Sequence, residues 1–292
     1  MNSPNGLLLV DKASGLTSHD VVARVRKLLG EKKVGHAGTL DPLATGLLVI
    51  AVGPSTRLLR FAQLGLKRYS GVVRFGEATN TLDADGEVVA TATVPSLNAD
   101  DLRVAAEAMC GPSTQIPPMV SALKVNGRRL YALAREGTEV ERSPRPIDVS
   151  EFTLWATSNP LEWAFHVVCT PGTYVRVLLV DLAERVGTLG HLASLRRLSS
   201  GSHDVTEART LEDLEAALTR HEEVLRAPRE LVSALAATEL TPAQCVDVRH
   251  GKQIDLPGVS SEFVAGLVDG ALVAVLRQRA QRYQPDVVLA SV

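Results

Sequence analysis

One short segment of this sequence concentrates the residue types that chemistry requires. The twelve residues from Gly35 to Gly46, GHAGTLDPLATG, hold three glycines, a proline, His36 and the carboxylate of Asp41. The pattern is neither a Walker loop nor a GxGxxG dinucleotide fingerprint. An apolar run follows at 47–52, so the segment is predicted to be a loop held on a rigid strand, where active-site residues are common.

Asp41 is the candidate for chemistry in this loop. A single positioned carboxylate can act as a nucleophile or as a general base, although an aspartate before a proline is also common in ordinary turns. A catalytic carboxylate must be kept ionised and aimed, and an arginine within hydrogen-bonding reach does both. Spacing alone does not choose that partner among the arginines of the chain.

A metal site is not expected. The seven histidines contain no HExxH pattern, and the three cysteines are widely spaced, at Cys110, Cys169 and Cys245. An odd number of dispersed cysteines argues against both a disulfide framework and a cysteine-based zinc site.

The elements next to the loop are predicted from hydrophobic periodicity. A short buried strand is expected at 6–10 and a second at 47–52. Between them, Ser18 is expected to cap a helix that runs to Leu29 and ends at Gly30, where a glycine suits the left-handed cap. The catalytic loop would then sit between a helix and a central strand.

Further along, strands and helices follow one another without regular alternation, which favours an α+β fold with an antiparallel or mixed sheet over a doubly wound one. Strands are expected at 69–75, 87–93, 161–167, 270–276 and 286–292. Helices are expected at 98–109, 178–186, 189–198 and 210–218, with Thr210 as the cap of the last.

Two domains are expected, with a catalytic domain over 1–230 and a smaller β-rich domain over 231–292. Within the first, prolines bound a segment at about 111–148 that carries six basic residues. A basic segment between such boundaries could be a binding lobe, or an ordinary helical insertion with a charged face.

Composition excludes several protein classes. The 292 residues carry 31 basic and 33 acidic side chains, and 45% are hydrophobic, as in a soluble globular protein. No apolar run approaches the roughly 18 residues that span a bilayer, and no secretory signal is recognisable at the N-terminus. A cytoplasmic protein without membrane contact is expected. Residues 1–75 hold 11 basic and 4 acidic residues, a net charge of +7, which suggests a phosphate-binding face.

Five motifs in order carry a family resemblance. They are LVDK at 9–12 with Gly15, GHAGTLDPLATG at 35–46, KRY at 67–69 with Gly76, Thr79, Thr81, Asp83 and Gly86, GTYVR at 172–176, and LRRL at 195–198. Together they strongly resemble the TruB family of bacterial tRNA pseudouridine synthases, which modify the T-loop uridine at tRNA position 55. The segments 115–118, 121–124 and 129–131 resemble the RNA-gripping insertion of that family. Ala13, Asn80 and Val120 stand where the family commonly has other residues.

The resemblance implies a fold and a set of roles. The fold would be that of pseudouridine synthases, with a mixed, largely antiparallel sheet flanked by helices and a small PUA-like C-terminal domain. Asp41 would be the catalytic nucleophile, Arg176 its ion-pair partner, and Tyr69 the residue that stacks on the target base and assists proton removal. The remaining implied substrate-binding residues are His36, Tyr174 and Leu195, with Lys12 as a weaker candidate.

The implied reaction breaks a C1′–N1 glycosidic bond, rotates the uracil and rejoins it through C5. Since no atoms are gained or lost, no cofactor and no metal are expected. The partner would be the T-arm stem-loop of tRNA, bound by a protein that is monomeric without an obligate protein partner.

Three alternatives stay open at this point. A non-catalytic tRNA-binding and folding chaperone would use the same basic surface. A hydrolytic glycosidase or nucleosidase would use Asp41 but normally needs a second carboxylate as acid. The archaeal and eukaryotic relatives that work in guide-RNA particles share the catalytic motif, but the insertion and the compact length favour the stand-alone bacterial type.

Overall fold

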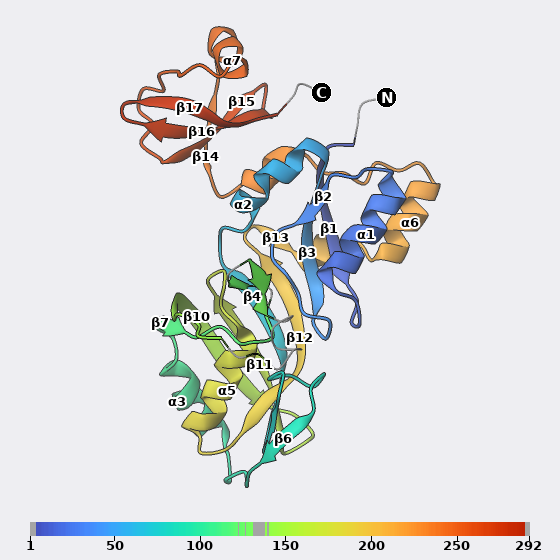
Figure 1. Ribbon diagram of the computed structural model, residues 1–292, viewed down its shortest axis with the longest axis vertical. Coiled ribbons are helices and arrows are strands. Elements are labelled where there is room, and N and C mark those ends of the chain that lie inside the picture. Colours follow the sequence, from blue (N-terminus) through green and yellow to red (C-terminus); the bar gives the residue numbers. More distant parts are fainter. Residues whose placement is uncertain (1–3, 122, 126, 131–137, 139, 290–292) are drawn as a thin grey trace.

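The described part of the chain forms one nine-stranded sheet, one four-stranded sheet and two two-stranded sheets, with helices packed beside the two larger ones (Figure 1). The computed structural model describes residues 4–121, 123–125, 127–130, 138 and 140–289. Its α-helices are α1 (Ser18–Leu29), α2 (Leu59–Ala62), α3 (Ala99–Glu107), α5 (Val175–Arg185), α6 (Leu211–Thr219) and α7 (Pro242–Arg249). The strands before the insertion are β1 (Gly6–Lys12), β2 (Val34–His36), β3 (Thr45–Val52), β4 (Lys67–Phe75), β5 (Glu77–Thr79), β6 (Val88–Thr91) and β7 (Gly111–Gln115). The strands that follow are β8 (Lys124–Val125), β9 (Arg128–Arg129), β10 (Arg145–Ala156), β11 (Glu162–Cys169), β12 (Gly190–Ser200), β13 (His203–Asp204), β14 (Ala236–Glu239), β15 (Phe263–Val268), β16 (Ala271–Arg279) and β17 (Arg282–Val288).

The large sheet has the strand order β1-β3-β12-β4-β11-β10-β7, with β2 paired to β3 and β13 paired to β12. Its pairs are antiparallel except for β3 and β12, which run parallel. The predicted α+β fold class with a mixed, largely antiparallel sheet is therefore confirmed.

One predicted helix is wrong. The segment 189–198 forms β12, a strand that joins the two halves of the sheet. Its leucines, alanine and arginines favour helices when taken alone, but tertiary context overrides such weak preferences. Here β4 pairs along nearly the whole strand on one side and β3 pairs on the other.

The predicted helix at 18–29 is confirmed as α1, with a different cap. Thr17, not Ser18, is the N-cap: its side chain accepts from the backbone of Asp20, and Asp20 accepts in return from Thr17. Gly30 ends the helix at φ 62°, a left-handed conformation that suits glycine. Because Thr17 takes the capping role, the hydroxyl of Ser18 is available for other contacts.

Helices cover different parts of the sheet (Figure 1). Apolar residues of α1 and α6 pack on one face of β1 and β3, and α3 and α5 pack on β4, β10, β11 and β12. The other face of β1 and β3 packs against α2 and against strands of the C-terminal sheet.

The C-terminal sheet has the order β14-β15-β16-β17 and carries α7. This confirms the β-rich C-terminal part of the predicted fold. The predicted domain boundary near 230 falls in the short 3-10 helix Pro228–Val232. There Leu231 and Val232 share a core with Leu7 of β1 and with Val275 of β16.

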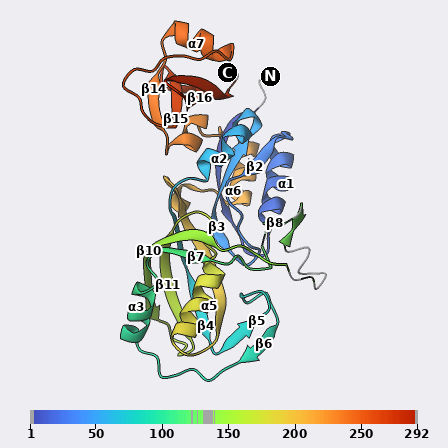
Figure 2. The same cartoon turned by 60° about the vertical axis from the view of Figure 1, so that its left-hand side comes forward.

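The predicted insertion begins and ends inside the large sheet. Strand β7 and the start of β10 pair with each other over Gly111–Gln115 and Arg145–Val149, so the chain leaves the sheet only between 116 and 144. Figure 2 shows the short β8 strand standing off the sheet. Ala122, Tyr131 and Arg135 of the predicted insertion lie outside the described residues.

Candidate functional site

The loop that carries Asp41 lies between β2 and β3 and is anchored on both sides of the carboxylate. The Ser18 hydroxyl accepts from the Leu40 amide at 2.8 Å and donates to the Leu40 carbonyl at 3.1 Å. The Pro42 carbonyl accepts from the Gly15 amide at 2.9 Å and from the Lys12 ammonium at 3.2 Å. Because both neighbours of Asp41 are held, its backbone has little freedom.

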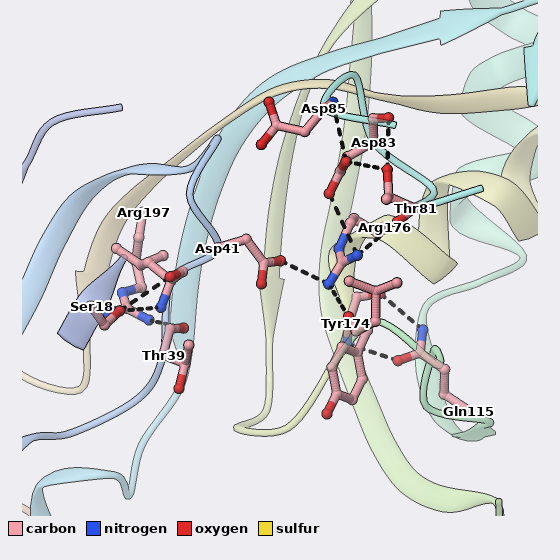
Figure 3. A network of polar contacts seen from close by, with 12 residues as sticks. Ser18, Thr39, Asp41, Thr81, Asp83, Asp85, Gln115, Tyr174, Arg176 and Arg197 are labelled. Carbon is pink, nitrogen blue, oxygen red and sulfur yellow. Dashed lines mark hydrogen bonds and ion pairs between the residues drawn. The ribbon is translucent and has the colours of Figure 1, made fainter. Parts of the chain in front are cut away.

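Asp41 forms an ion pair with Arg176, whose guanidinium is shared with a second carboxylate (Figure 3). Nη2 of Arg176 lies 2.9 Å from Oδ2 of Asp41, and Nη1 lies 3.5 Å from Oδ2 of Asp83. Nη1 and Nη2 also donate to the carbonyls of Thr81 (2.7 Å) and Val120 (2.8 Å). This side chain is only 3% exposed, so its position is fixed by these four partners.

Burial raises the pKa of the Asp41 carboxyl, while the charge of Arg176 opposes that shift and the charge of Asp83 adds to it. The Asp41 side chain is 40% exposed. The ion pair and this access to solvent favour the ionised carboxylate before substrate enters.

Arg176 is positioned by the start of α5. Tyr174 precedes the helix, and Gln115 at the end of β7 binds its backbone twice. The side-chain amide of Gln115 donates to the Tyr174 carbonyl at 3.1 Å, and its oxygen accepts from the Tyr174 amide at 2.8 Å. The buried Gln115 side chain thus fixes the turn that presents both Tyr174 and Arg176.

A pocket of about 540 Å³ opens beside Asp41. Six of the seven predicted site residues line it, from four segments of the chain: 36–41, β4, the start of α5 and β12. These residues are His36, Asp41, Tyr69, Tyr174, Arg176 and Leu195. The structure therefore brings together side chains that lie far apart in the sequence.

The aromatic and apolar walls come from the sheet and the α5 turn. Tyr69 projects from β4 and is buried, which raises the pKa of its hydroxyl. Tyr174 also has a raised pKa because of burial. Leu195 lies on β12, and His36 ends β2, where its ring packs edge-on against His19 at 6.3 Å.

Lys12 is not among the residues that line the pocket. It is fully buried behind the loop, and its ammonium donates to the carbonyls of Ala13, Leu16 and Pro42. Burial lowers its pKa to about 8. The structure places Lys12 as a support of the Asp41 loop.

Four residues of the site were not assigned roles from the sequence: Asp83, Gln115, Lys67 and Arg197. Two of them carried a usable signal, because strand side chains alternate between faces. Lys67 is in phase with Tyr69 on β4, and Arg197 is in phase with Leu195 on β12. Asp83 and Gln115 stand in segments that carry the family resemblance, but no periodicity marks either one as part of the site, because Arg176 and Tyr174, which they contact, are distant in sequence.

Among the described residues, no group of three or more His, Cys, Asp or Glu side chains could hold a metal ion. In the same part of the chain, no helix is long and apolar enough to cross a membrane.

Known proteins match this sequence along nearly the whole chain. Residues 26–175 match the N-terminal domain of TruB family pseudouridylate synthases, and residues 176–239 match the C-terminal domain of tRNA pseudouridylate synthase B. A Leifsonia xyli protein named tRNA pseudouridine synthase B is 43% identical over 95% of this chain and 94% of its own. A protein of the same name from Streptococcus gordonii is 40% identical over 96% and 98%.

The fold is also similar to solved structures. A chain in the crystal structure of a Cbf5-Nop10-Gar1 complex aligns with a TM-score of 0.75 at 23% identity, covering 97% of this chain and 84% of that one. A chain in the structure of an H/ACA RNP bound to a substrate RNA containing 2′-deoxyuridine also gives a TM-score of 0.75, at 20% identity and 98% and 85% coverage.

Proposed function

Because the chain belongs to the TruB family of pseudouridylate synthases, we propose that it isomerises the T-loop uridine at tRNA position 55, with Asp41 as the nucleophile. The observation that carries the proposal is the ion pair of Asp41 with the buried Arg176 at the wall of a pocket that also holds Tyr69. Chemically, this is an aimed carboxylate beside an aromatic surface.

Cleavage of the C1′–N1 bond builds positive charge at C1′ of the ribose. A carboxylate at that atom stabilises the charge or captures it covalently, as in retaining glycosidases. Asp41 is suited to this because it is held on both sides by the loop anchors and remains accessible from the pocket. Arg176 keeps it ionised as substrate displaces water.

The detached uracil has to stay in the site while it turns. Tyr69 offers a ring on which the base stacks, with Leu195 and Tyr174 as the other walls. The raised pKa of Tyr69 keeps its hydroxyl neutral near pH 7, which supports the stacking role more than proton removal by a phenolate.

A hydrolytic glycosidase would require a second carboxylate facing the substrate. The nearest candidate is Asp83, which contacts Arg176 on a different nitrogen from Asp41 and is not among the residues that line the pocket. The geometry therefore favours isomerisation. That reaction rearranges one nucleotide without adding or removing atoms, so the proposal includes neither cofactor nor metal.

The target uridine must leave its stack to reach Asp41, at a cost of a few kcal/mol. His36, at the pocket wall, is proposed to help hold the loop with this nucleotide extruded. The basic residues of the first quarter and of the insertion would hold phosphates, so tRNA binding should weaken steeply as salt rises. We further propose that the protein is a cytoplasmic monomer and that its C-terminal PUA-like part also contacts tRNA.

The test is tritium release from tRNA transcribed with uridine labelled at C5, because pseudouridine has the same mass as uridine. We expect about one label released per tRNA, from the T-loop, and none from Asp41→Asn with tRNA binding kept, as for the loss of an essential catalytic group. Unchanged release by Asp41→Asn would refute the nucleophile. No release by the native protein despite tight binding would leave a tRNA chaperone, and free uracil would indicate a hydrolase.

A further inference from the structure

Two buried cations line the same pocket without an ion-pair partner among the described residues. Lys67, on β4, is 6% exposed, and Arg197, on β12, is 1% exposed. They converge on the Asp41 loop at Gly38, where a Cβ atom would lie 3.5 Å from Nη1 of Arg197 and 3.8 Å from Cε of Lys67. Burying two neighbouring positive charges is costly unless something compensates them.

The two cations are held only by neutral groups. Arg197 donates to the carbonyls of Leu47 (2.7 Å) and Gly38 (3.1 Å), which fixes its guanidinium against the loop. Lys67 donates to the Ser200 hydroxyl at 3.2 Å and, weakly, to the Gln63 carbonyl at 3.5 Å. An ammonium carries three N–H donors, so one N–H of Lys67 has no acceptor among the described residues.

The pocket is therefore electrically polarised. Asp41, Asp83 and Arg176 together carry a formal charge of −1, and Lys67 with Arg197 carries +2. Figure 3 shows Asp41 between the two guanidinium groups, with Arg176 on one side and Arg197 on the other. Heterolysis of a glycosidic bond leaves positive charge on the sugar and negative charge on the base. The negative side of the pocket, at Asp41, suits the sugar, and the positive side, at Lys67 and Arg197, suits the base.

We propose that Lys67 is a further catalytic residue, which with Arg197 at its side stabilises the negative charge on the uracil as the C1′–N1 bond breaks. This inference rests on the proposed function. The bonding pair stays on N1 and spreads to the carbonyl oxygens of the base, while C1′ bonds to the Asp41 carboxylate. C5 then attacks C1′ and the carboxylate leaves. The proton on C5 is lost to solvent, and N1 takes up a proton from solvent, so the product is an isomer of the substrate. Fixed cations aimed at developing charge stabilise a transition state without reorganisation.

The test is the single-turnover rate of tritium release at saturating tRNA. We expect Lys67→Met to lower this rate on the order of 10²-fold, the effect typical of removing one stabilising donor, with the Kd for tRNA unchanged. Lys67→Arg should keep most of the rate because it keeps the charge. The matched control is Arg103→Met, an exposed basic side chain on α3 that lies outside the surfaces proposed to bind tRNA.

A pH series distinguishes an effect of the Lys67 charge on the rate from a structural effect of replacing the side chain. Desolvation, together with the charge of Arg197, lowers the pKa of Lys67 to about 8. Its other neighbours are the side chain of Cys169, whose own pKa is raised to about 11, the Ser200 hydroxyl and the Gln63 carbonyl. The native rate should fall more steeply than the Lys67→Arg rate as pH rises through 8, because Lys12, whose pKa is also about 8, titrates in both proteins. This comparison holds even if Lys67→Met fails to fold.

Two results would overturn the inference. One is a Lys67→Met rate equal to that of Arg103→Met, or a loss confined to tRNA affinity, which would make Lys67 a phosphate contact. The other is the same pH profile for native protein and Lys67→Arg. Failure of the native protein to release tritium would instead refute the proposed function.

Discussion

Replacing Arg176 by methionine is the sharpest perturbation of this site. The substitution removes one cation that two carboxylates share and leaves two backbone carbonyls, those of Thr81 and Val120, without their donor. The buried volume is nearly kept, so the change is mainly electrostatic. Asp83 is left as an almost fully buried charge with no cation beside it.

The expected cost follows from the burial of the pair. Removing one partner of a buried ion pair destabilises a protein by about 3–5 kcal/mol, because an uncompensated charge stays behind. In domains near this size, each kcal/mol lowers the Tm by about 2–4 °C. Arg24→Met is the control, because the Arg24–Glu212 pair is 3.9 Å apart and exposed, and such pairs contribute at most about 1 kcal/mol.

The deficit should depend on pH with a definite sign. Burial already raises the pKa of Asp41 above its ordinary value of 3.8, and loss of Arg176 should raise this pKa further. Above pH 3.8, the folded variant then binds more protons than its unfolded chain, so its stability increases as pH falls. The gap between native protein and Arg176→Met should be widest at pH 7–8 and narrower at pH 5.

Thermal and urea unfolding of both variants at pH 5, 6, 7 and 8 would measure this gap. Tritium release by Arg176→Met should be lost at every pH, because Asp41 is neither aimed nor kept ionised. A gap that stays constant with pH would refute the electrostatic reasoning and assign the loss to the two backbone hydrogen bonds. A gap no larger than that of Arg24→Met would refute the structural role of the pair.

Two further substitutions test the supports of the site. In Gln115→Glu, the new carboxylate cannot donate to the Tyr174 carbonyl, so we expect the free energy of unfolding to fall by about 1–3 kcal/mol and turnover to slow. Both effects should be partly reversed as pH falls, because the protonated acid regains a donor. Unfolding and turnover measurements that show no such recovery would argue against this hydrogen bond. In Lys12→Met, three carbonyls lose their donor, so we expect lower stability and slower turnover. Because the folded pKa of Lys12 is about 8 and the unfolded value is 10.5, native stability gains with rising pH in this window. The native advantage over Lys12→Met should therefore grow between pH 7.5 and 9.5, and an advantage that shrinks would contradict the assignment.

Local patterns were sufficient for the elements whose own residues determine their conformation. Helix α1 has its apolar stripe and Gly30, and β3 is a continuous apolar run. Strand β12 could not be identified in this way, because its residues favour a helix and its conformation is imposed by β3 and β4. Such an assignment needs knowledge of the neighbours.

The candidate site also contains residues that local patterns identify and residues that they do not. Asp41 stands in a loop whose composition marks it as unusual, so the sequence alone singled it out. Its partner Arg176 lies 135 residues away and was chosen only through the family resemblance, as no spacing rule links the two. Lys67 lies between these two cases. Alternation along β4 places its side chain on the same face as that of Tyr69, but the sequence pattern does not distinguish a buried lysine from an exposed lysine at the end of a strand.

The central place of β12 has a consequence for how this protein folds. The strand joins β3 to β4, and therefore joins the part of the sheet that carries Asp41 to the part that carries Tyr69 and leads into Arg176. A chain still emerging from the ribosome contains all three residues before residue 190 is made, yet the two halves of its sheet are not connected. Until then β4, and the start of β3 at Thr45 and Gly46, each lack a partner strand on one side. Unpaired strand edges promote association with other chains. Closing contacts of such long sequence separation is slow, so the pocket should be the last part of the large sheet to form.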